Sequence, residues 1–441
     1  MLQFMMSDLL KHAKSLARPR CGADAWPQVS AVLATAPPPH SAGASGITTL
    51  DGTSAEVVRS FRSEHEDRRR PALLRGLTNT WPAMPSAKEN PRAWTFENLT
   101  ARLGGEIVHV GETDDGEDVP VPLGVFCEGY VGVQRDRNPL LIFDAVVLER
   151  LRLRAEGIGR ARDGDDGGCP IDLAEALRQD ISRDYEIPAL FARDDCLGVL
   201  DELERPPHEW ILLAPQRSGS PVHTDPMATN AWNALLVGVK RWALFHPDTP
   251  HELLRPLRHR IPRGAGRSGG CGGAGSDGGG RGEEGRGGRE VRVAADGAAA
   301  HAKENVELED DWEDVWGWFH EDLASIGARV DAYFEQRLRE TRDTAVERGT
   351  DDIDRPWWIE FDQRAGETVF VPAEWHHAVL NVTDTVAVTH NYVCASNLSD
   401  AWRGANAEGM EAEMAAKWRE RIAAEQPALL HLMPPVSCWQ D

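Results

Sequence analysis

The sequence predicts a mainly β protein with helical additions, built on a core of the jelly-roll or cupin kind. Two observations support this fold class. Short runs of apolar and β-branched residues, separated by turn residues, follow one another closely in residues 210–245 and again in residues 357–392. The chain also lacks an internal repeat, a βαβ rhythm and a GxGxxG motif, which argues against a Rossmann fold. Many short strands at close spacing are typical of an antiparallel sandwich or barrel.

Composition narrows the functional classes. The 441 residues are 41% hydrophobic, which is enough for one large or two ordinary domains with a core. Asp and Glu number 71 against 48 Lys and Arg, giving a formal charge of −23. We therefore expect a protein or peptide partner rich in Arg and Lys rather than a nucleic acid. No apolar run approaches the roughly 20 residues of a membrane helix, so we expect no membrane association.

The seven cysteines are scattered and form no CxxC pair, which indicates reduced thiols and an intracellular protein, in the nucleus or the cytoplasm. Residues 1–53 are predicted to be a flexible tail. Met1 to Arg20 carries four basic residues and one acid, as an organelle transit peptide would. A short helix or frayed tail is the interpretation that we favour.

Residues 54–184 are predicted to form an α/β elaboration that precedes the β core. A buried strand is expected within residues 72–82, a helix and a strand within 94–110, a further strand over 139–144, and an Arg-rich helix from residue 145. A loop insertion rich in Gly and Asp is predicted near residue 168.

The β core itself is assigned to residues 185–253 and 311–397. Its predicted strands are Trp210–Ala214, Ala231–Val237, Arg241–Phe245, Trp357–Phe361, Thr368–Val371, His377–Asn381 and Thr385–Tyr392. A helical pattern covers residues 312–345.

Two segments flank or interrupt this core. Residues 254–310 are rich in Gly and Arg and are predicted to be a disordered insertion, with an RNA-binding RGG tract as the less favoured alternative. Residues 398–441 are predicted to close the chain with one amphipathic helix over 400–424. Its apolar face would pack on the barrel or mediate a homodimer.

The motif His223-Thr224-Asp225 is the first chemical signal. In an extended strand, residues two apart point to the same side, so an imidazole and a carboxylate could reach one metal ion together. Two histidines and one carboxylate leave three coordination positions open, which suits Fe(II) oxygenases. A third ligand must come from a distant strand, and His376 or His377 could supply it. Periodicity alone does not choose between these two.

Several polar residues lie on predicted strands that are otherwise apolar. Lys240 would be a cation on a dry barrel wall, and Thr389 could add a hydroxyl donor for an anionic co-substrate. A lysine that extends to solvent is the simpler alternative for Lys240. Asn233 and Asn391 are either pocket residues or partners in cross-strand hydrogen bonds.

Two long blocks of the sequence resemble one known family. Residues 185–247, including His223-Thr-Asp225 and Gly238-Val-Lys-Arg-Trp, and residues 366–391, including Pro372-Ala-Glu-Trp-His-His, are similar to the JmjC (Jumonji C) 2-oxoglutarate oxygenases. Arg70-Pro-Ala-Leu-Leu-Arg-Gly-Leu77 resembles an earlier segment of the same proteins. The similarity is greatest to the branch containing the bifunctional arginine demethylase and lysyl-hydroxylase.

The resemblance implies a double-stranded β-helix that binds Fe(II), 2-oxoglutarate and O2. It implies that His223, Asp225 and His377 are the iron ligands, because the family ligand lies two residues after the tryptophan matched by Trp375. It implies that Lys240 and Thr389 hold the distal carboxylate of 2-oxoglutarate. Asn233 matches a co-substrate contact, Ser220 matches a nearby threonine position, and Asn391 lies at the end of the matching strand.

The implied function is hydroxylation of a protein side chain, as lysyl hydroxylation or as N-demethylation of arginine or lysine. A metal-binding cupin without oxygenase activity and an inactive JmjC scaffold are the alternatives. Three departures from the family pattern concern His376, where an aromatic residue is usual, Leu141, where a pocket tyrosine is usual, and the interval of 152 residues between Asp225 and His377. The Lys-rich nuclear-targeting tails of the closest relatives are absent.

Overall fold

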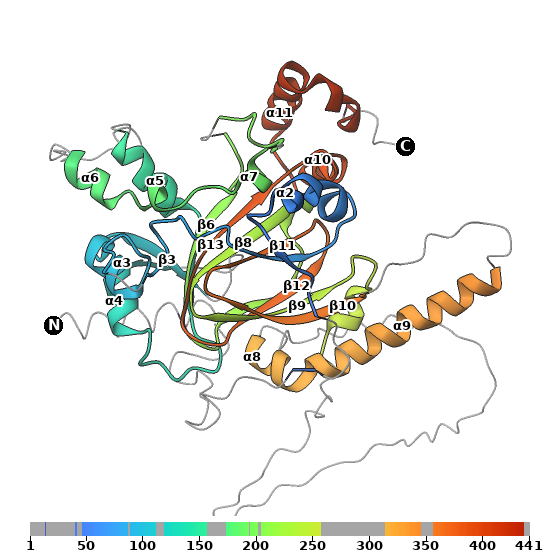
Figure 1. Ribbon diagram of the computed structural model, residues 1–441, viewed down its shortest axis with the longest axis horizontal. Coiled ribbons are helices and arrows are strands. Elements are labelled where there is room, and N and C mark those ends of the chain that lie inside the picture. The colour runs from blue at the N-terminus through green and yellow to red at the C-terminus, as the bar shows by residue number, and fades with distance from the viewer. Residues whose placement is uncertain are drawn as a thin grey trace, which may run out of the picture. The chain divides into compact units, whose positions relative to one another are not determined.

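A computed structural model of the chain describes residues 14, 40–41, 46–86, 89–111, 119–156, 173–193, 195–201, 204–256, 314–344 and 356–435. Two β-sheets face each other and are surrounded by helices (Figure 1). The larger sheet has nine strands in the order β1-β2-β11-β8-β13-β6-β5-β3-β4. The smaller sheet has four, in the order β10-β9-β12-β7. The predicted jelly-roll core is confirmed.

The strands of the four-stranded sheet pair antiparallel, with β12 between β9 and β7. Their bounds are β7 Gly219–His223, β9 Val239–Phe245, β10 Trp358–Arg364 and β12 His376–Asn381. The strands β8 and β9 form the predicted hairpin, and Gly238 between them has a φ of 91°. A side chain at Gly238 would also lie 2.2 Å from the carbonyl oxygen of Asp384, so only glycine fits this turn.

The nine-stranded sheet combines core strands with strands from the N-terminal region. Its members are β1 Thr49–Asp51, β2 Ala72–Arg75, β3 Ile107–Gly111, β4 Val119–Pro122, β5 Leu141–Asp144, β6 Glu209–Ala214, β8 Asn230–Val237, β11 Glu367–Val371 and β13 Thr385–Tyr392. The region 54–184 is therefore not a separate layer, because β5, β3 and β4 continue the sheet beyond β6. Apolar side chains of these strands form the largest core cluster, with Trp232, Phe370 and Val388 buried in it.

The helices of the described part cover the sheets and their ends. Their bounds are α2 Ala55–Phe61, η2 Arg62–Glu66, α3 Phe96–Leu103, α4 Leu123–Gly129, α5 Val146–Ala155, α6 Leu173–Gln179, η3 Ile181–Asp184, α7 Ala189–Ala192, η4 Pro226–Ala228, η5 His251–Leu254, α8 Val315–Gly317, η7 Trp318–Asp322, α9 Leu323–Thr344, α10 Leu398–Ala407, α11 Ala412–Glu425 and η8 Pro427–Leu432. The Thr95 side chain caps α3 by accepting a hydrogen bond from the backbone N–H of Asn98. None of these helices is long and apolar enough to cross a membrane.

Three sequence-based boundaries need correction. The tail assigned to residues 1–53 contains strand β1, which pairs in parallel with β2. The single C-terminal helix predicted over 400–424 is two helices, α10 and α11, because Gly409 takes a φ of 87° between them. The strand that carries His223 ends there, so Asp225 lies beyond it, although its own backbone is still extended.

The amphipathic faces of α10 and α11 are covered by the chain itself. Trp402 and Trp418 are fully buried, and their rings contact each other at 5.8 Å between centroids. They pack with Leu197, Leu200 and Ile422 in one apolar cluster. Packing against the core is therefore the role of this face, and the homodimer stays a prediction. The Gly/Arg-rich insertion, the loop near residue 168 and most of the N-terminal tail lie outside the described residues.

Candidate metal and co-substrate site

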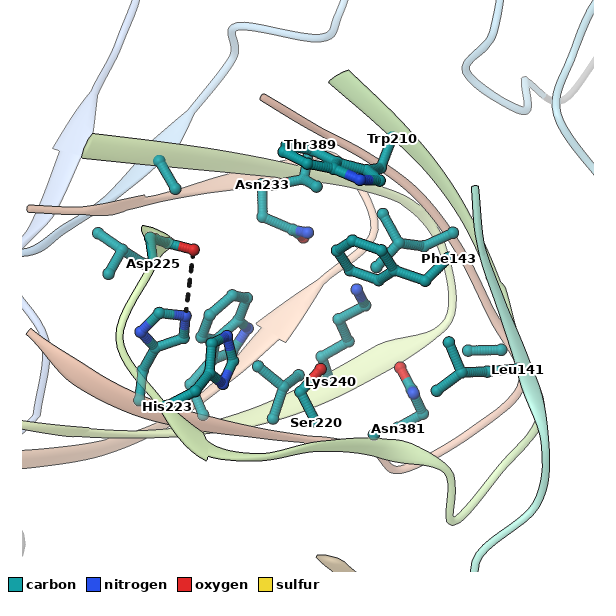
Figure 2. A pocket seen from close by; sticks show the side chains of 18 of the residues that line it. Leu141, Phe143, Trp210, Ser220, His223, Asp225, Asn233, Lys240, Asn381 and Thr389 are labelled. Atoms are coloured by element: carbon teal, nitrogen blue, oxygen red, sulfur yellow. Dashed lines mark ion pairs between the residues drawn. The ribbon is translucent and has the colours of Figure 1, made fainter. Parts of the chain in front are cut away.

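A pocket lies between the two sheets and contains all eight residues singled out from the sequence. The four-stranded sheet contributes one wall with Ser220, Lys240 and His377, and the nine-stranded sheet contributes the other with Asn233, Thr389 and Asn391. His223 and Asp225 lie at the end of strand β7 and complete the set. Figure 2 shows Lys240 opposite Asn233 and Thr389, with Asp225 and His223 at one end of the pocket.

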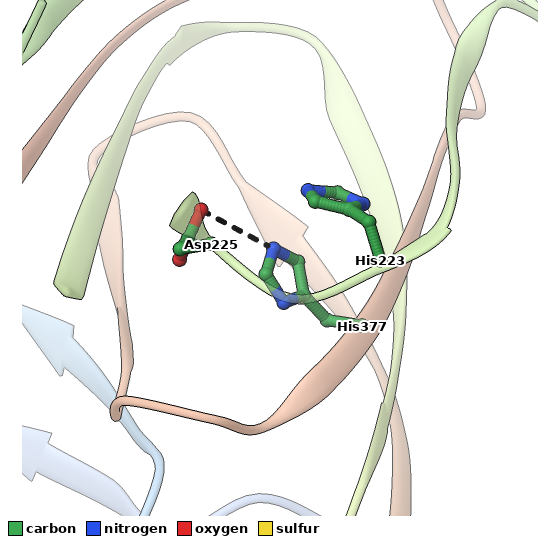
Figure 3. A group of neighbouring side chains, drawn as sticks. All are labelled: His223, Asp225 and His377. Carbon is green, nitrogen blue, oxygen red and sulfur yellow. Dashed lines mark ion pairs between the residues drawn. The ribbon is translucent and has the colours of Figure 1, made fainter. Parts of the chain in front are cut away.

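His223, Asp225 and His377 form a potential metal centre. One ligand atom from each residue can be chosen so that all three atoms lie within 4.8 Å of one another. Strand pairing explains this closeness, because His377 on β12 is the direct cross-strand neighbour of His223 on β7. The carboxylate of Asp225 faces them, with its Oδ1 4.0 Å from Nε2 of His377 (Figure 3). Within the described part of the chain, this is the one group with metal-ligand spacing.

In both histidines, a hydrogen bond from Nδ1 to the backbone carbonyl two residues earlier orients the ring. The Nδ1 atom of His223 lies 2.8 Å from the carbonyl oxygen of Pro221, and Nδ1 of His377 lies 3.0 Å from that of Trp375. A carbonyl can only accept, so Nδ1 carries the proton and donates it in each ring. The Nε2 lone pairs are therefore free for a metal ion, an arrangement that is typical of metal-binding histidines.

Electrostatics favour a cation at this position. Burial, and to a smaller extent His223, lower the pKa of His377 well below its usual value, so that its imidazole is neutral and able to bind metal. Burial raises the pKa of Asp225, although His223 opposes this effect. Oδ2 of Asp225 is buried without a hydrogen-bond partner. A divalent cation would satisfy this orphaned oxygen, and the donor set of two imidazoles and one carboxylate fits Fe(II).

The adjacent histidine, His376, points elsewhere. It is half-buried and lies in a neighbouring groove, where its ring centroid is 6.3 Å from that of His251. The opposite orientations of His376 and His377 follow from the two-residue period of β12. The indole of Trp242 lies beside His377 with its ring centroid at 6.0 Å, which supports the ring that faces the pocket.

Lys240 lies deeper in the same pocket and is 2% exposed. Burial lowers its pKa to about 7, and no charged neighbour contributes to this shift. Among the described residues, Lys240 forms no ion pair. The snorkelling alternative is therefore wrong. A buried ammonium group without a counter-ion is a binding site for an anion such as a carboxylate.

The hydroxyl group of Thr389 is engaged differently from the sequence-based expectation. It donates a hydrogen bond of 2.9 Å to the carbonyl oxygen of Trp232. To donate to a carboxylate it must rotate away from that carbonyl. Asn233, by contrast, has an unengaged polar atom: its Oδ1 is buried without a hydrogen-bond partner, and the residue lines the pocket. Asn391 donates to the hydroxyl oxygen of Thr229 at 2.9 Å and supports the segment after Asp225.

Sequence reasoning missed part of the pocket wall. Phe143 and Trp210 pack with ring centroids 5.7 Å apart and form an apolar side beside Leu141, the position at which the sequence comparison expected a pocket residue. Asn381 donates hydrogen bonds to the backbone and the hydroxyl of Ser218 and closes the end near Lys240. Asn381 was detectable, because it shares the strand face of His377. Trp210 had no such signal, since it depends on which strand lies opposite.

Comparison with known proteins supports the fold. The cupin-like domain family matches residues 58–397, which is more than three quarters of the chain. The chain belongs to the cupin-like domain family. This cupin-like chain is 28% identical to the bifunctional arginine demethylase and lysyl-hydroxylase psr-1 of Caenorhabditis briggsae, over 96% of the chain and 80% of that protein.

Two further relatives of the cupin-like chain carry related names. The arginine-specific demethylase JMJ22 of Arabidopsis thaliana is 26% identical over 80% of the chain and 47% of that protein. The human 2-oxoglutarate and iron-dependent oxygenase JMJD4 is 43% identical over 54% of the chain and 40% of that protein. The resemblance predicted from the two sequence blocks is confirmed at the level of the family.

Proposed function

We propose that this protein is an Fe(II)- and 2-oxoglutarate-dependent oxygenase that hydroxylates a protein side chain. The observation that carries the proposal is the combination, in one pocket, of a 2-His-1-carboxylate set and a buried lysine without a counter-ion. The names of relatives that match most of the chain support it, since they describe arginine demethylases and lysyl-hydroxylases. Fe(II) with 2-oxoglutarate and O2 supplies the oxidation of a C–H bond, with release of succinate and CO2.

The residues of the chain have separate tasks. His223, Asp225 and His377 would hold the iron through their free Nε2 and carboxylate atoms. Lys240 would bind the distal carboxylate of 2-oxoglutarate, with Thr389 as a second donor after rotation of its hydroxyl group. Asn233 and Ser220 would contact the part of the co-substrate that lies between the metal ligands and Lys240. Phe143 and Trp210 keep water from this wall, which strengthens the electrostatic attraction at Lys240.

The structure disfavours the two alternative functions. A metal-binding cupin without oxygenase activity has no need for an uncompensated lysine close to the metal site. An inactive scaffold has no need for histidine rings that are both oriented with a free Nε2 atom.

The substrate that we propose is a basic protein segment. A groove of about 870 Å³ begins at Asp225 and carries Asp248, Glu374, Asp400 and Glu408 on its walls. Arg69 pairs with Glu374 and Asp400, Arg403 pairs with Asp400, and Arg337 pairs with Asp248, so five carboxylates of the groove meet three arginine side chains. This excess of carboxylates attracts lysine and arginine side chains toward the metal centre. Hydroxylation of a side-chain carbon leaves a stable alcohol, whereas hydroxylation of an N-methyl group releases formaldehyde. An intracellular location, in the nucleus or the cytoplasm, stays a prediction.

Release of succinate from 2-oxoglutarate tests the oxygenase proposal. The protein would be purified without oxygen and then supplied with Fe(II), ascorbate and air, beside His223→Ala and Lys240→Ala. We expect substrate-independent turnover in the wild type and its loss in both variants. Turnover that is equal in all three proteins, or no turnover together with no binding of Fe(II) or 2-oxoglutarate in a thermal-shift assay, contradicts the proposal.

Peptides then test the substrate class. Lysine-rich and arginine-rich peptides, with and without N-methyl groups, would be compared with acidic peptides of the same length. We expect only basic peptides to stimulate succinate release, with either a mass gain of one oxygen or the release of formaldehyde. Equal stimulation by acidic peptides contradicts the proposed role of the groove.

A further inference from the structure

The turn that follows Asp225 has an unfavourable backbone conformation. Met227 and Ala228 have φ values of 55° and 47°, in the left-handed region that side chains with a Cβ atom avoid. Two such residues in succession persist only where their surroundings fix them. This turn, η4, begins directly at Asp225, so its conformation decides where the carboxylate lies.

Helix α10 and its ends supply contacts that hold the turn. The carboxylate of Glu408, just after α10, accepts hydrogen bonds from the backbone N–H of Met227, at 2.8 Å to Oε1 and 3.0 Å to Oε2. At the other end of α10, the amide of Asn397 donates to the carbonyl oxygen of Ala228 at 2.9 Å. Between these contacts, the helix backbone at Gly404 lies directly on Met227, where a Cβ atom would come within 2.9 Å of the Met227 backbone.

The strand side of the turn is fixed independently. The Thr229 hydroxyl donates to the carbonyl oxygen of Pro226 at 2.9 Å, and Asn391 donates to that hydroxyl. The contacts from Thr229 and Asn391 belong to the β core, whereas those from Glu408 and Asn397 come from the C-terminal helices. The metal-ligand turn therefore lies between two structural units that must both be in place.

We propose that Glu408 is a positioning residue, which holds the turn of Met227 and thereby places the carboxylate of Asp225 for metal binding. This inference rests on the proposed function, because it concerns the same metal site. Glu408 is not itself placed to bind the metal, since its carboxylate is used by the Met227 N–H group. Its loss releases the strained turn and lets Asp225 leave the position opposite His223 and His377.

Metal affinity measured on the apoprotein tests this role without reference to turnover. Co(II), which gives a visible absorption spectrum, would be titrated into wild type, Glu408→Ala, Glu408→Gln and Glu411→Ala. Glu411 is the matched control, because it is an exposed acid near Glu408 but makes none of the hydrogen bonds to the turn described above. We expect the Co(II) dissociation constant to rise about tenfold in Glu408→Ala. Glu408→Gln, which keeps one acceptor oxygen, should lie between it and wild type.

A second variant approaches the turn from the helix side. Gly404→Ala keeps every charge and pushes the Met227 backbone, so it should raise the Co(II) dissociation constant in the same direction and alter the Co(II) spectrum. Gly404→Ala also tests the positioning role of the turn if Glu408→Ala does not fold. Co(II) affinities of Glu408→Ala and Gly404→Ala within twofold of Glu411→Ala overturn the inference. Failure of the metal site itself would appear differently, as wild-type Co(II) binding no tighter than that of His223→Ala.

Discussion

The two ends of the pocket differ in how the protein prepares them for a ligand. At the metal end, the protein arranges its ligands before any ion arrives: two backbone carbonyls orient His223 and His377, and burial keeps His377 neutral. At the other end, Lys240 is buried with no partner for its charge. The metal end is therefore preorganised, whereas the lysine end lacks a counter-ion, and an anionic ligand would stabilise the charged form of Lys240 there.

The largest effect should come from the metal end. His377→Ala removes a ligand from a set of three and should weaken Fe(II) or Co(II) binding at least about 100-fold. His376→Ala is the matched control, because it removes the adjacent imidazole, which points into a different groove. Isothermal titration with Co(II) compares the two. Equal losses in both variants would show that the strand face of β12 does not determine the ligand.

At the lysine end, Lys240→Met should weaken 2-oxoglutarate binding by about 100-fold, since a buried charge-assisted contact is lost. Metal affinity should stay within about twofold of the wild type, because Lys240 makes no contact with the ligand set. Binding of 2-oxoglutarate to the Mn(II)-loaded protein and of Mn(II) alone gives both numbers. A loss of both 2-oxoglutarate and metal affinity in Lys240→Met would mean that the lysine end and the metal end do not act independently.

Gly219→Ala should damage the metal end through the backbone. A Cβ atom at Gly219 would lie 1.9 Å from the carbonyl oxygen of Val379, so strands β7 and β12 must move apart. We expect a loss of about 2 kcal/mol in the free energy of unfolding, measured with urea, together with weaker metal binding.

Gly105→Ala is the control for this substitution, since nothing lies within 4 Å of the Cβ position there. If Gly219→Ala is as stable as Gly105→Ala and binds metal as tightly, the close approach of the two strands is not needed for the site.

The apoprotein should also show a pH-dependent stability. The pKa of Lys240 falls to about 7 in the folded protein, so between pH 7 and 10 the unfolded chain holds a proton that the folded chain lacks. The free energy of unfolding of the apoprotein should therefore rise with pH in this range, by up to about 1.4 kcal/mol per unit. Below pH 7 both states are protonated and this contribution is lost.

Urea unfolding of wild type and Lys240→Met at pH 7.5 and 9 measures this difference. The pH-dependent gain should be larger in the wild type, because methionine cannot titrate. Parallel behaviour of the two proteins would mean that the buried ammonium group is compensated in some other way.

The sequence was sufficient for most of the strand pattern, and the family resemblance chose His377 over His376 as the histidine that the structure brings to His223 and Asp225. A short run of β-branched and apolar residues after a turn predicted β13 at its observed bounds, Thr385–Tyr392, and the two-residue period placed Asn381 on the face of His377. What the sequence could not supply were contacts between distant segments. The left-handed backbone at Met227 and Ala228 has no local signal, because neither residue is a glycine.

The helix break illustrates the same limit. Apolar spacing continues across residues 400–424, so one helix was expected, and only the backbone of Gly409 shows the turn between α10 and α11. The engagement of the Thr389 hydroxyl by the Trp232 carbonyl could not be predicted either, since it depends on the register between β13 and β8.

The contact between Trp242 and His377 should make the tryptophan fluorescence of the protein sensitive to metal binding. An indole whose centroid is 6.0 Å from a metal-binding imidazole lies close enough for a paramagnetic ion such as Co(II) to quench its emission. Metal occupancy should then be readable as a fall in intrinsic fluorescence, without a label or a turnover assay. Trp242→Phe would remove this signal and leave the emission of the other tryptophans, of which the sequence has 15 in all, as background.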